Sequence, residues 1–270
     1  MVELVQRATP VQTAGLRVNL RVEGAGPPLL FLGGSNYDMS LRAPVFSSEL
    51  MGAFTVASAD PRGLGLTDAP DGDWRMQDYA RDALDLLDVL GWQKADVLGE
   101  SFGAMTALHL AALAPERINR IALSAGAAGG QGGSSYPIHE FQNIADPRSR
   151  ARAALEILDS RFADLAAAEA EKQVEARSAS DAVFMAHGAN AQNHPRLLRA
   201  RAGHDAWDHL PNITAPTLVF AGRYDMQAPP DRAENIACAM PNAALHMIEG
   251  GHGICFATPD PVSIILKDWT

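Results

Sequence analysis

The sequence predicts an α/β domain whose mostly parallel sheet is flanked by helices, with a helical segment inserted after the sixth strand. Two observations carry this prediction. Short, continuously apolar runs alternate with helical patterns, and this alternation stops between residues 138 and 209 before it resumes. The chain of 270 residues, of which 47% are hydrophobic, is long enough to fill the core of such a domain.

Six apolar runs, each ending in turn or loop residues, are expected to form the core strands, because continuously apolar strands are typical of a parallel sheet covered on both faces. Upstream of them, residues 15–24 (GLRVNLRVEG) alternate between apolar and polar side chains and predict an antiparallel hairpin strand. The six runs are 28–34 (PLLFLGG), 54–60 (FTVASAD), 95–101 (ADVLGES), 120–126 (RIALSAG), 217–225 (TLVFAGRYD) and 244–252 (ALHMIEGGH).

Helical patterns lie between these runs. Residues 78–91 (DYARDALDLLDVLG) place apolar side chains on one face and aspartates on the other, and Gly91 predicts the end of that helix. A second helix is expected to follow Ser101 and to end before Pro115, because proline cannot continue a helix.

The insertion begins with a Gly/Ser-rich stretch. Residues 126–137 (GAAGGQGGSSYP) predict a linker or mobile loop, and residues 138–209, rich in Ala, Arg and Glu, contain no strand pattern. We therefore expect a core formed by residues 1–128 and 210–270, and a helical insertion formed by residues 129–209.

The bulk composition argues against several classes of protein. A formal net charge of -10 disfavours nucleic acid and anionic membrane surfaces as partners, and no apolar stretch approaches the roughly 20 residues of a membrane span. The eight histidines lack the spacing of metal ligands, and the start MVELVQRATP lacks an export pattern. Cys238 and Cys255 form no CxxC pair, which fits a reducing, cytoplasmic location. We expect no metal and no cofactor, and a homo-oligomer stays open.

The segment GESFG, residues 99–103, lies where an apolar run gives way to a helix. A lone serine between two glycines fits a tight turn, and it also fits a nucleophile at the tip of a strained turn. A serine hydroxyl is a poor nucleophile, so the second interpretation requires a base, a group that orients the base, and donors for an oxyanion. Such groups meet where the carboxyl ends of parallel strands lie.

Two residues fit the required roles at two further strand ends. Asp225 ends one apolar run, and His252 closes another in a glycine-flanked loop. The chain order Ser, Asp, His is the order expected for this type of turn. Glu249 is a second carboxylate nearby, but it is expected on the approach of the strand rather than on the loop after it, so Asp225 is favoured.

Five ordered segments together resemble the α/β-hydrolase family, specifically its small, capped members. The segment LLFLGGS is similar to the family's oxyanion loop after the third strand, and ADPRGLGLTDAP to its D-x-R-G-x-G-x-S-D segment, with Thr67 in place of the usual serine. The segment VLGESFGAMTALHLAALAPERI is similar to the nucleophile turn and its helix, and APTLVFAGRYDMQAPP and IEGGHGICFATPDPV to the acid and histidine segments. The resemblance spans nearly the whole chain and implies that the helical insertion is a cap.

The resemblance implies roles for individual residues. Ser101 matches the nucleophile, Asp225 the acid and His252 the base. The place where some relatives carry the acid, after the preceding strand, reads LSAGAAG and holds no carboxylate, which again favours Asp225.

The resemblance also implies an oxyanion hole, formed by the backbone N–H groups of Phe102 and Ser35, with Gly34 as an alternative to Ser35. The family usually has His-Gly where this chain has Gly33 and Gly34, so different packing must hold the loop. Asn36 and Tyr37, together with Phe102, lie on loops that should face the nucleophile, and we expect them to line the substrate pocket.

Other polar residues are expected to be structural. Asp60, Arg62 and Asp68 should pin a strand end through charge-assisted hydrogen bonds, His109 should pack in the core, and Glu100 either shapes the turn or is solvated. Five histidines of the insertion are expected at the surface or in packing, with one or two within reach of a substrate: His139, His187, His194, His204 and His209.

The residues and the resemblance together predict a serine hydrolase that cleaves a small-molecule carboxylic ester or lactone through an acyl-enzyme. Hydrolysis of a carbon-carbon bond in a diketone-like compound is an alternative, although the glycine-proline-rich loop of many such relatives is missing. A protein of the same fold that binds a small ligand with little turnover is the alternative from a different class. Cap helices decide specificity in this fold, so these alternatives stay open.

Overall fold

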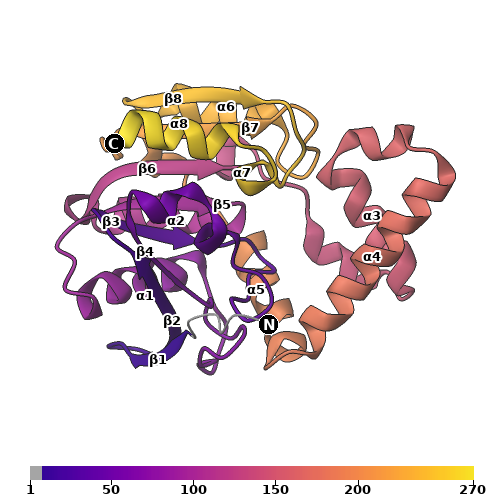
Figure 1. Ribbon diagram of the computed structural model, residues 1–270, viewed down its shortest axis with the longest axis horizontal. Coiled ribbons are helices and arrows are strands. Elements are labelled where there is room, and N and C mark those ends of the chain that lie inside the picture. Colours follow the sequence, from indigo (N-terminus) through magenta and orange to yellow (C-terminus); the bar gives the residue numbers. More distant parts are fainter. Residues whose placement is uncertain (1–7) are drawn as a thin grey trace.

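An eight-stranded sheet runs through the molecule (Figure 1), which is described by a computed structural model over residues 8–270. The prediction that the segment MVELVQRATP lacks an export pattern concerns residues 1–10, most of which lie outside this described range. The strand order is β1-β2-β4-β3-β5-β6-β7-β8, with β2 antiparallel to β1 and β4 and all later pairs parallel. The strands are β1 (Thr9–Gln12), β2 (Arg17–Gly24), β3 (Pro28–Leu32), β4 (Thr55–Ala59), β5 (Ala95–Glu100), β6 (Ile118–Ser124), β7 (Thr217–Gly222) and β8 (Ala243–Ile248).

Helices flank the sheet and form the insertion. Within residues 8–270, no helix has the length and apolar character that crossing a membrane requires. The helices are α1 (Met76–Val89), α2 (Phe102–Leu113), α3 (Pro147–Leu158), α4 (Ala167–Ala186), α5 (Asn190–Ala202), α6 (Pro230–Ala239), α7 (Ile254–Ala257) and α8 (Asp260–Trp269). The two helices predicted around residue 101, before and after it, are α1 and α2, and α2 ends before Pro115 as expected.

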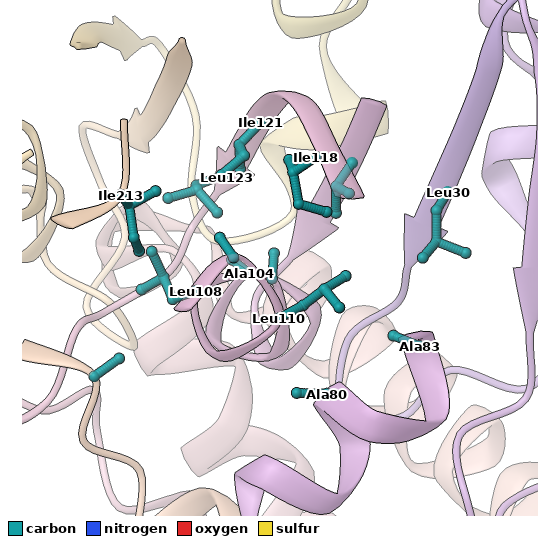
Figure 2. Packing of buried hydrophobic residues seen from close by; sticks show 14 of the residues in the cluster. Leu30, Ala80, Ala83, Ala104, Leu108, Leu110, Ile118, Ile121, Leu123 and Ile213 are labelled. Carbon is teal, nitrogen blue, oxygen red and sulfur yellow. The ribbon is translucent and has the colours of Figure 1, made fainter. Parts of the chain in front are cut away.

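Both faces of the sheet are buried at its central strands. Leu30 of β3 belongs to the apolar layer that includes α1, α2 and α6, whereas its neighbours Leu29 and Phe31 belong to the opposite layer with α7 and α8. Figure 2 shows side chains of α2 packed between α1 and β6. Because successive side chains of a strand point to opposite faces, this two-sided burial explains the continuously apolar runs and confirms the predicted fold class.

The strands end earlier than the apolar runs do. β7 ends at Gly222 and β8 at Ile248, so Asp225 and His252 lie on the loops that follow these strands. Glu249 is the first residue after β8, and the expectation that it belongs to the strand approach is therefore wrong. Both predicted partners of Ser101 thus lie at the carboxyl edge of the sheet.

A helical insert follows β6, and between β6 and β7 the structure contains helices and no strand. Helices α3 and α4 lie to one side of the sheet (Figure 1) and share a small apolar cluster of their own. Helix α5 instead contributes Leu197 and Leu198 to a buried cluster that also contains Phe102 and Met105 of α2. Helix α5 is therefore packed directly on the core, and Phe184 near the end of α4 reaches the same cluster.

The glycine-rich stretch 126–137 passes close to other backbone. Gly129 has a φ of 76°, and a Cβ atom there would overlap the carbonyl of His204. The Tyr136 N–H donates to the Gln227 carbonyl at 2.7 Å. Close approach accounts for glycine in part of this stretch, and its mobility stays a prediction.

Candidate active site

The turn between β5 and α2 places Ser101 at the carboxyl edge of the sheet. Ser101 has φ 54° and ψ -111°, a backbone conformation that residues with side chains rarely adopt. A Cβ at Gly99 would overlap the backbone of Gly103, and a Cβ at Gly103 would overlap the Leu32 carbonyl at the end of β3. The turn is therefore strained at the serine, and the two glycines admit the close backbone contacts around it.

Ser101, His252 and Asp225 form a hydrogen-bonded chain. His252 Nε2 lies 2.7 Å from Ser101 Oγ, and His252 Nδ1 lies 2.8 Å from Asp225 Oδ2. All three side chains are buried. In this arrangement a histidine can take the hydroxyl proton while the carboxylate fixes the imidazole tautomer and stabilises its charge.

Asp225 is oriented by its own loop. Its Oδ1 atom accepts hydrogen bonds from the backbone N–H groups of Gln227 at 2.8 Å and Ala228 at 2.9 Å. These bonds leave Oδ2 directed at His252, so the loop that holds the carboxylate also sets its orientation.

Glu249 has different partners. Its carboxylate pairs with Arg223 and accepts a hydrogen bond from the Tyr224 hydroxyl at 3.1 Å. These hydrogen bonds hold the pKa of Glu249 below its ordinary value. Of the two carboxylates considered from the sequence, Asp225 is the one that contacts His252.

Two backbone N–H groups are the candidate donors to an oxyanion. Phe102 is the first residue of α2, where an N–H has no acceptor within the helix and the helix dipole favours negative charge. Opposite, Gly34 and Tyr37 close a turn through a 3.0 Å hydrogen bond, and a Cβ at Gly34 would lie 3.7 Å from Ser101 Cβ. Among the described residues, no acceptor is assigned to the N–H of Phe102 or of Ser35, so both can donate to an oxyanion.

Tyr37 packs instead of facing a substrate. Its ring lies edge-on to Phe31, with centroids 5.5 Å apart, and its hydroxyl lies 3.0 Å from Ser58 Oγ. A Cβ at Gly33 would overlap the Tyr37 ring. The tyrosine therefore fills the space beside the first glycine of the oxyanion loop, and this packing role replaces the predicted substrate contact.

The side chain of Phe102 is also buried, edge-on to Tyr79 at a centroid distance of 4.8 Å. Its place in the pocket lining stays a prediction, since the side chain of Ser101 is buried too. Asn36, in contrast, is exposed, and its substrate contact stays a prediction.

Cap side chains hold the loop after β3. Asp38 is fully buried, and its Oδ2 atom lies 2.6 Å from His187 Nδ1 and accepts a hydrogen bond from Asn190 Nδ2 at 2.9 Å. The Asn190 Oδ1 atom accepts the N–H of Gly65 at 2.7 Å. A single residue of α5 thus connects the loop after β3 to the loop after β4.

One turn further along α5, His194 Nε2 lies 3.0 Å from Asn36 Oδ1. Burial lowers the pKa of His194 to about 4, so the imidazole is neutral at pH 7 and can donate one N–H to the amide oxygen. This chain has Gly33 and Gly34 where the family usually has His-Gly, so other side chains must hold the loop. Those side chains are Tyr37, Asn190 and His194.

Glu100 precedes the nucleophile and is half-buried. Burial raises the pKa of its carboxyl, and the nearby His252 and Arg42 partly oppose this effect. The carboxyl is therefore not freely solvated, which favours the interpretation that it shapes the environment of the turn.

The acidic segment after β4 has the structural role expected of it. Asp60 is buried and accepts the N–H of Met39 at 2.7 Å, while Arg62 makes two hydrogen bonds to Asp82, at 2.6 and 2.7 Å. Asp68 accepts a backbone N–H at the start of β2 at 3.2 Å. These contacts fix the segment against its neighbours.

His109 and His204 form a buried pair with ring nitrogens 3.1 Å apart. Burial lowers the pKa of each imidazole to about 4, and His204 Nε2 lies 2.8 Å from the Ala127 carbonyl. The packing role predicted for His109 is confirmed.

Asn190 and Gln227 were not among the residues predicted from the sequence. Asn190 contacts partners 125 and 152 residues away, for which the sequence carries no signal. For Gln227 the sequence does carry one signal, which is its position two residues after Asp225 on the same loop. Its Nε2 atom lies 2.7 Å from His252 Nε2.

The alpha/beta hydrolase fold family model matches residues 28–259, and the chain belongs to this family. The chain is 35% identical over 130 residues to the 2-hydroxymuconate semialdehyde hydrolase of Pseudomonas sp. strain CF600, a match that covers 47% of this chain and 44% of that protein. It is 25% identical over 236 residues to the serine hydrolase BPHL of Mus musculus, covering 84% and 73% of the two chains.

Among solved structures, the enol-lactonase from Burkholderia xenovorans LB400 has a similar fold, with a TM-score of 0.79 and 24% sequence identity. The superposition covers 96% of this chain and 98% of that one. The predicted family is confirmed by the family model over residues 28–259, and the likeness in fold extends over nearly the whole chain.

Proposed function

We propose that the protein is a serine hydrolase that cleaves a small-molecule carboxylic ester or lactone through an acyl-enzyme. The observation that carries the proposal is the hydrogen-bonded chain from Ser101 through His252 to Asp225. The proposed oxyanion donors are the N–H groups of Phe102 and Ser35, with Gly34 as the alternative to Ser35. A strained serine with a base in hydrogen-bond contact is the arrangement that nucleophilic catalysis requires.

In the first half-reaction, His252 Nε2 takes the proton of Ser101 as Oγ attacks the carbonyl carbon. Asp225 stabilises the imidazolium that forms, and the N–H groups of Phe102 and Ser35 hold the negative oxygen. The intermediate then collapses, and His252 returns the proton to the leaving alkoxide. In a lactone that alcohol remains attached to the acyl group.

In the second half-reaction, water replaces the alcohol. Its proton goes to His252 Nε2 while its oxygen forms the new bond to the acyl carbon, and the proton passes to Ser101 Oγ as the carbon-oxygen bond to the serine breaks. The carboxylic acid leaves, and the free enzyme is restored.

The choice of an ester or lactone is supported by the likeness in fold to an enol-lactonase across nearly the entire chain. A second candidate is carbon-carbon bond hydrolysis, which is favoured by the 35% identity to a 2-hydroxymuconate semialdehyde hydrolase. The same serine and histidine could serve either substrate, so the cap decides between them.

We also infer a reducing, cytoplasmic location and a small-molecule partner. The inferred location is supported by free thiols at both cysteines.

The test is the intact mass of the protein after exposure to a fluorophosphonate, for the wild type and for Ser101→Ala. We expect the wild type to gain one phosphonyl group and the variant none. The same labelling is then repeated in competition with esters, lactones and vinylogous diketones.

Protection by a lactone or an ester would support the first candidate, and protection by a diketone alone would support the second. A folded wild type that resists labelling but melts at a higher temperature with one of these compounds would point to a ligand-binding protein with little turnover.

A further inference from the structure

The base has a second polar neighbour that the steps above do not use. Gln227 Nε2 lies 2.7 Å from His252 Nε2, the same ring nitrogen that lies 2.7 Å from Ser101 Oγ. The Gln227 side chain is buried. A neutral imidazole has one lone pair at this nitrogen, so the serine hydroxyl and the carboxamide compete for it.

The backbone of Gln227 is fixed on both sides. Its N–H donates to Asp225 Oδ1 at 2.8 Å, and its carbonyl accepts the N–H of Tyr136 at 2.7 Å. The loop that orients the acid therefore also directs this carboxamide at the base. Among the described residues, no protein partner is assigned to Gln227 Oε1, so the carboxamide retains an acceptor for a small molecule.

The position of the Gln227 carboxamide next to His252 Nε2 matters when Ser101 is acylated. The serine then has no hydroxyl proton to donate, and His252 Nε2 must receive a proton from water instead. A water molecule that does this must come within hydrogen-bond distance of Nε2, and therefore next to the Gln227 carboxamide, which lies 2.7 Å from the same nitrogen. The carboxamide has two N–H donors and one acceptor with which to hold that water.

We propose that Gln227 is a catalytic residue of deacylation, whose carboxamide holds the hydrolytic water at His252 Nε2. The carboxamide N–H releases the lone pair of Nε2 to the water, which loses one proton to Nε2 as its oxygen bonds to the acyl carbon, and the second hydrogen of the water donates to Gln227 Oε1. The proton on Nε2 then passes to Ser101 Oγ as the acyl bond to serine breaks. The inference rests on the proposed acyl-enzyme.

The experiment separates the two half-reactions in Gln227→Met, which keeps the side-chain volume and removes the hydrogen bonds. Stopped-flow release of p-nitrophenol from p-nitrophenyl butyrate reports acylation in the burst and deacylation in the steady state. We expect the burst rate and the rate of fluorophosphonate labelling to stay within about 3-fold of wild type, and the steady-state rate to fall about 10- to 100-fold.

Added methanol supplies a second readout, because it competes with water for the acyl-enzyme. The fraction of methyl butyrate formed should rise in Gln227→Met, since the variant loses its hold on water. Gln192→Met, an exposed position on α5, is the matched control and should leave all these quantities unchanged. Should Gln227→Met fail to fold, Gln227→Asn withdraws the same carboxamide by one methylene and should show the same loss in the steady state.

Equal losses in the burst rate and the steady-state rate of Gln227→Met, or no loss in either rate, would overturn the proposed role of Gln227. That outcome differs from failure of the proposed function, in which wild-type Ser101 is not labelled and p-nitrophenyl butyrate forms no acyl-enzyme.

Discussion

The two loops that carry the candidate oxyanion donors are held in place in different ways. The turn that bears Phe102 is fixed by backbone contacts inside the core, through Gly99 and Gly103. The loop that bears Ser35 is fixed by side chains of the cap, through Asn190 and His194 of α5. The first donor therefore depends on local sequence, and the second depends on where a distant helix is packed.

The largest effect should come from crowding the core-held turn. In Gly103→Ala, the new Cβ would meet backbone atoms of Leu32 and Gly33, which have little freedom to move. We expect a loss of about 3 kcal/mol in the free energy of unfolding. Hydrolysis of p-nitrophenyl butyrate should fall by more than about 100-fold, because Ser101 and Phe102 are displaced together. Thermal melting and kcat/KM measure these effects.

Gly34→Ala is the matched change on the cap-held loop. Its nearest neighbours would be Ser101 Cβ at 3.7 Å and the Glu100 carbonyl at 3.8 Å, which is ordinary contact. We expect the free energy of unfolding to change by less than about 1 kcal/mol. Equal destabilisation by the two substitutions would contradict the distinction between the loops.

The next effect tests the cap contacts directly. Asn190→Ala removes a donor to the buried Asp38 and leaves the Gly65 N–H without its acceptor. Unpaired buried groups should lower the free energy of unfolding by about 2 kcal/mol, and displacement of the loop donor should lower kcat about 10- to 100-fold with KM within about 3-fold.

Gln192→Ala, at an exposed position on the same helix, is the control and should resemble the wild type. If Asn190→Ala loses stability but keeps its kcat, then α5 merely supports the fold and does not set the oxyanion loop.

The same contrast explains what the sequence could predict. Local patterns predict the strands, the turn at Ser101 and the loops that bear Asp225 and His252. Apolar runs indicate buried strands, and glycines indicate turns, at the positions where they occur. No local sequence pattern indicates that Asn36 contacts His194, which lies 158 residues further along the chain. A pattern placed Tyr37 on the correct loop, but the direction of its side chain depends on Phe31 and Gly33 packing around it.

A smaller, pH-dependent effect should act on the cap-held loop. Burial holds the pKa of His194 at about 4 in the folded state, against about 6.5 for an unfolded chain. The unfolded state therefore binds more protons between these values. The contribution of His194 to stability is present above pH 6.5 and is lost as the pH falls toward 4.

At pH 5 this loss should amount to about 1–2 kcal/mol. His194→Gln, which keeps a donor for Asn36 and does not titrate, should therefore show a smaller drop in melting temperature between pH 7 and pH 5 than the wild type. His209→Gln replaces an exposed histidine and should leave the drop as in the wild type. An identical drop in all three proteins would exclude a buried, neutral His194.

The smallest effect concerns the residue whose role the structure changes. Tyr37→Phe removes the hydroxyl that contacts Ser58 but keeps the ring against Phe31 and Gly33. Ser58 Oγ retains a 3.0 Å hydrogen bond to the Phe31 carbonyl, so no group is left unpaired. We expect a loss of about 1 kcal/mol or less, and KM for p-nitrophenyl butyrate within about 2-fold of wild type. A KM raised 10-fold at unchanged stability would return Tyr37 to the substrate pocket and would mean that the loop after β3 opens further from the core than its packing indicates.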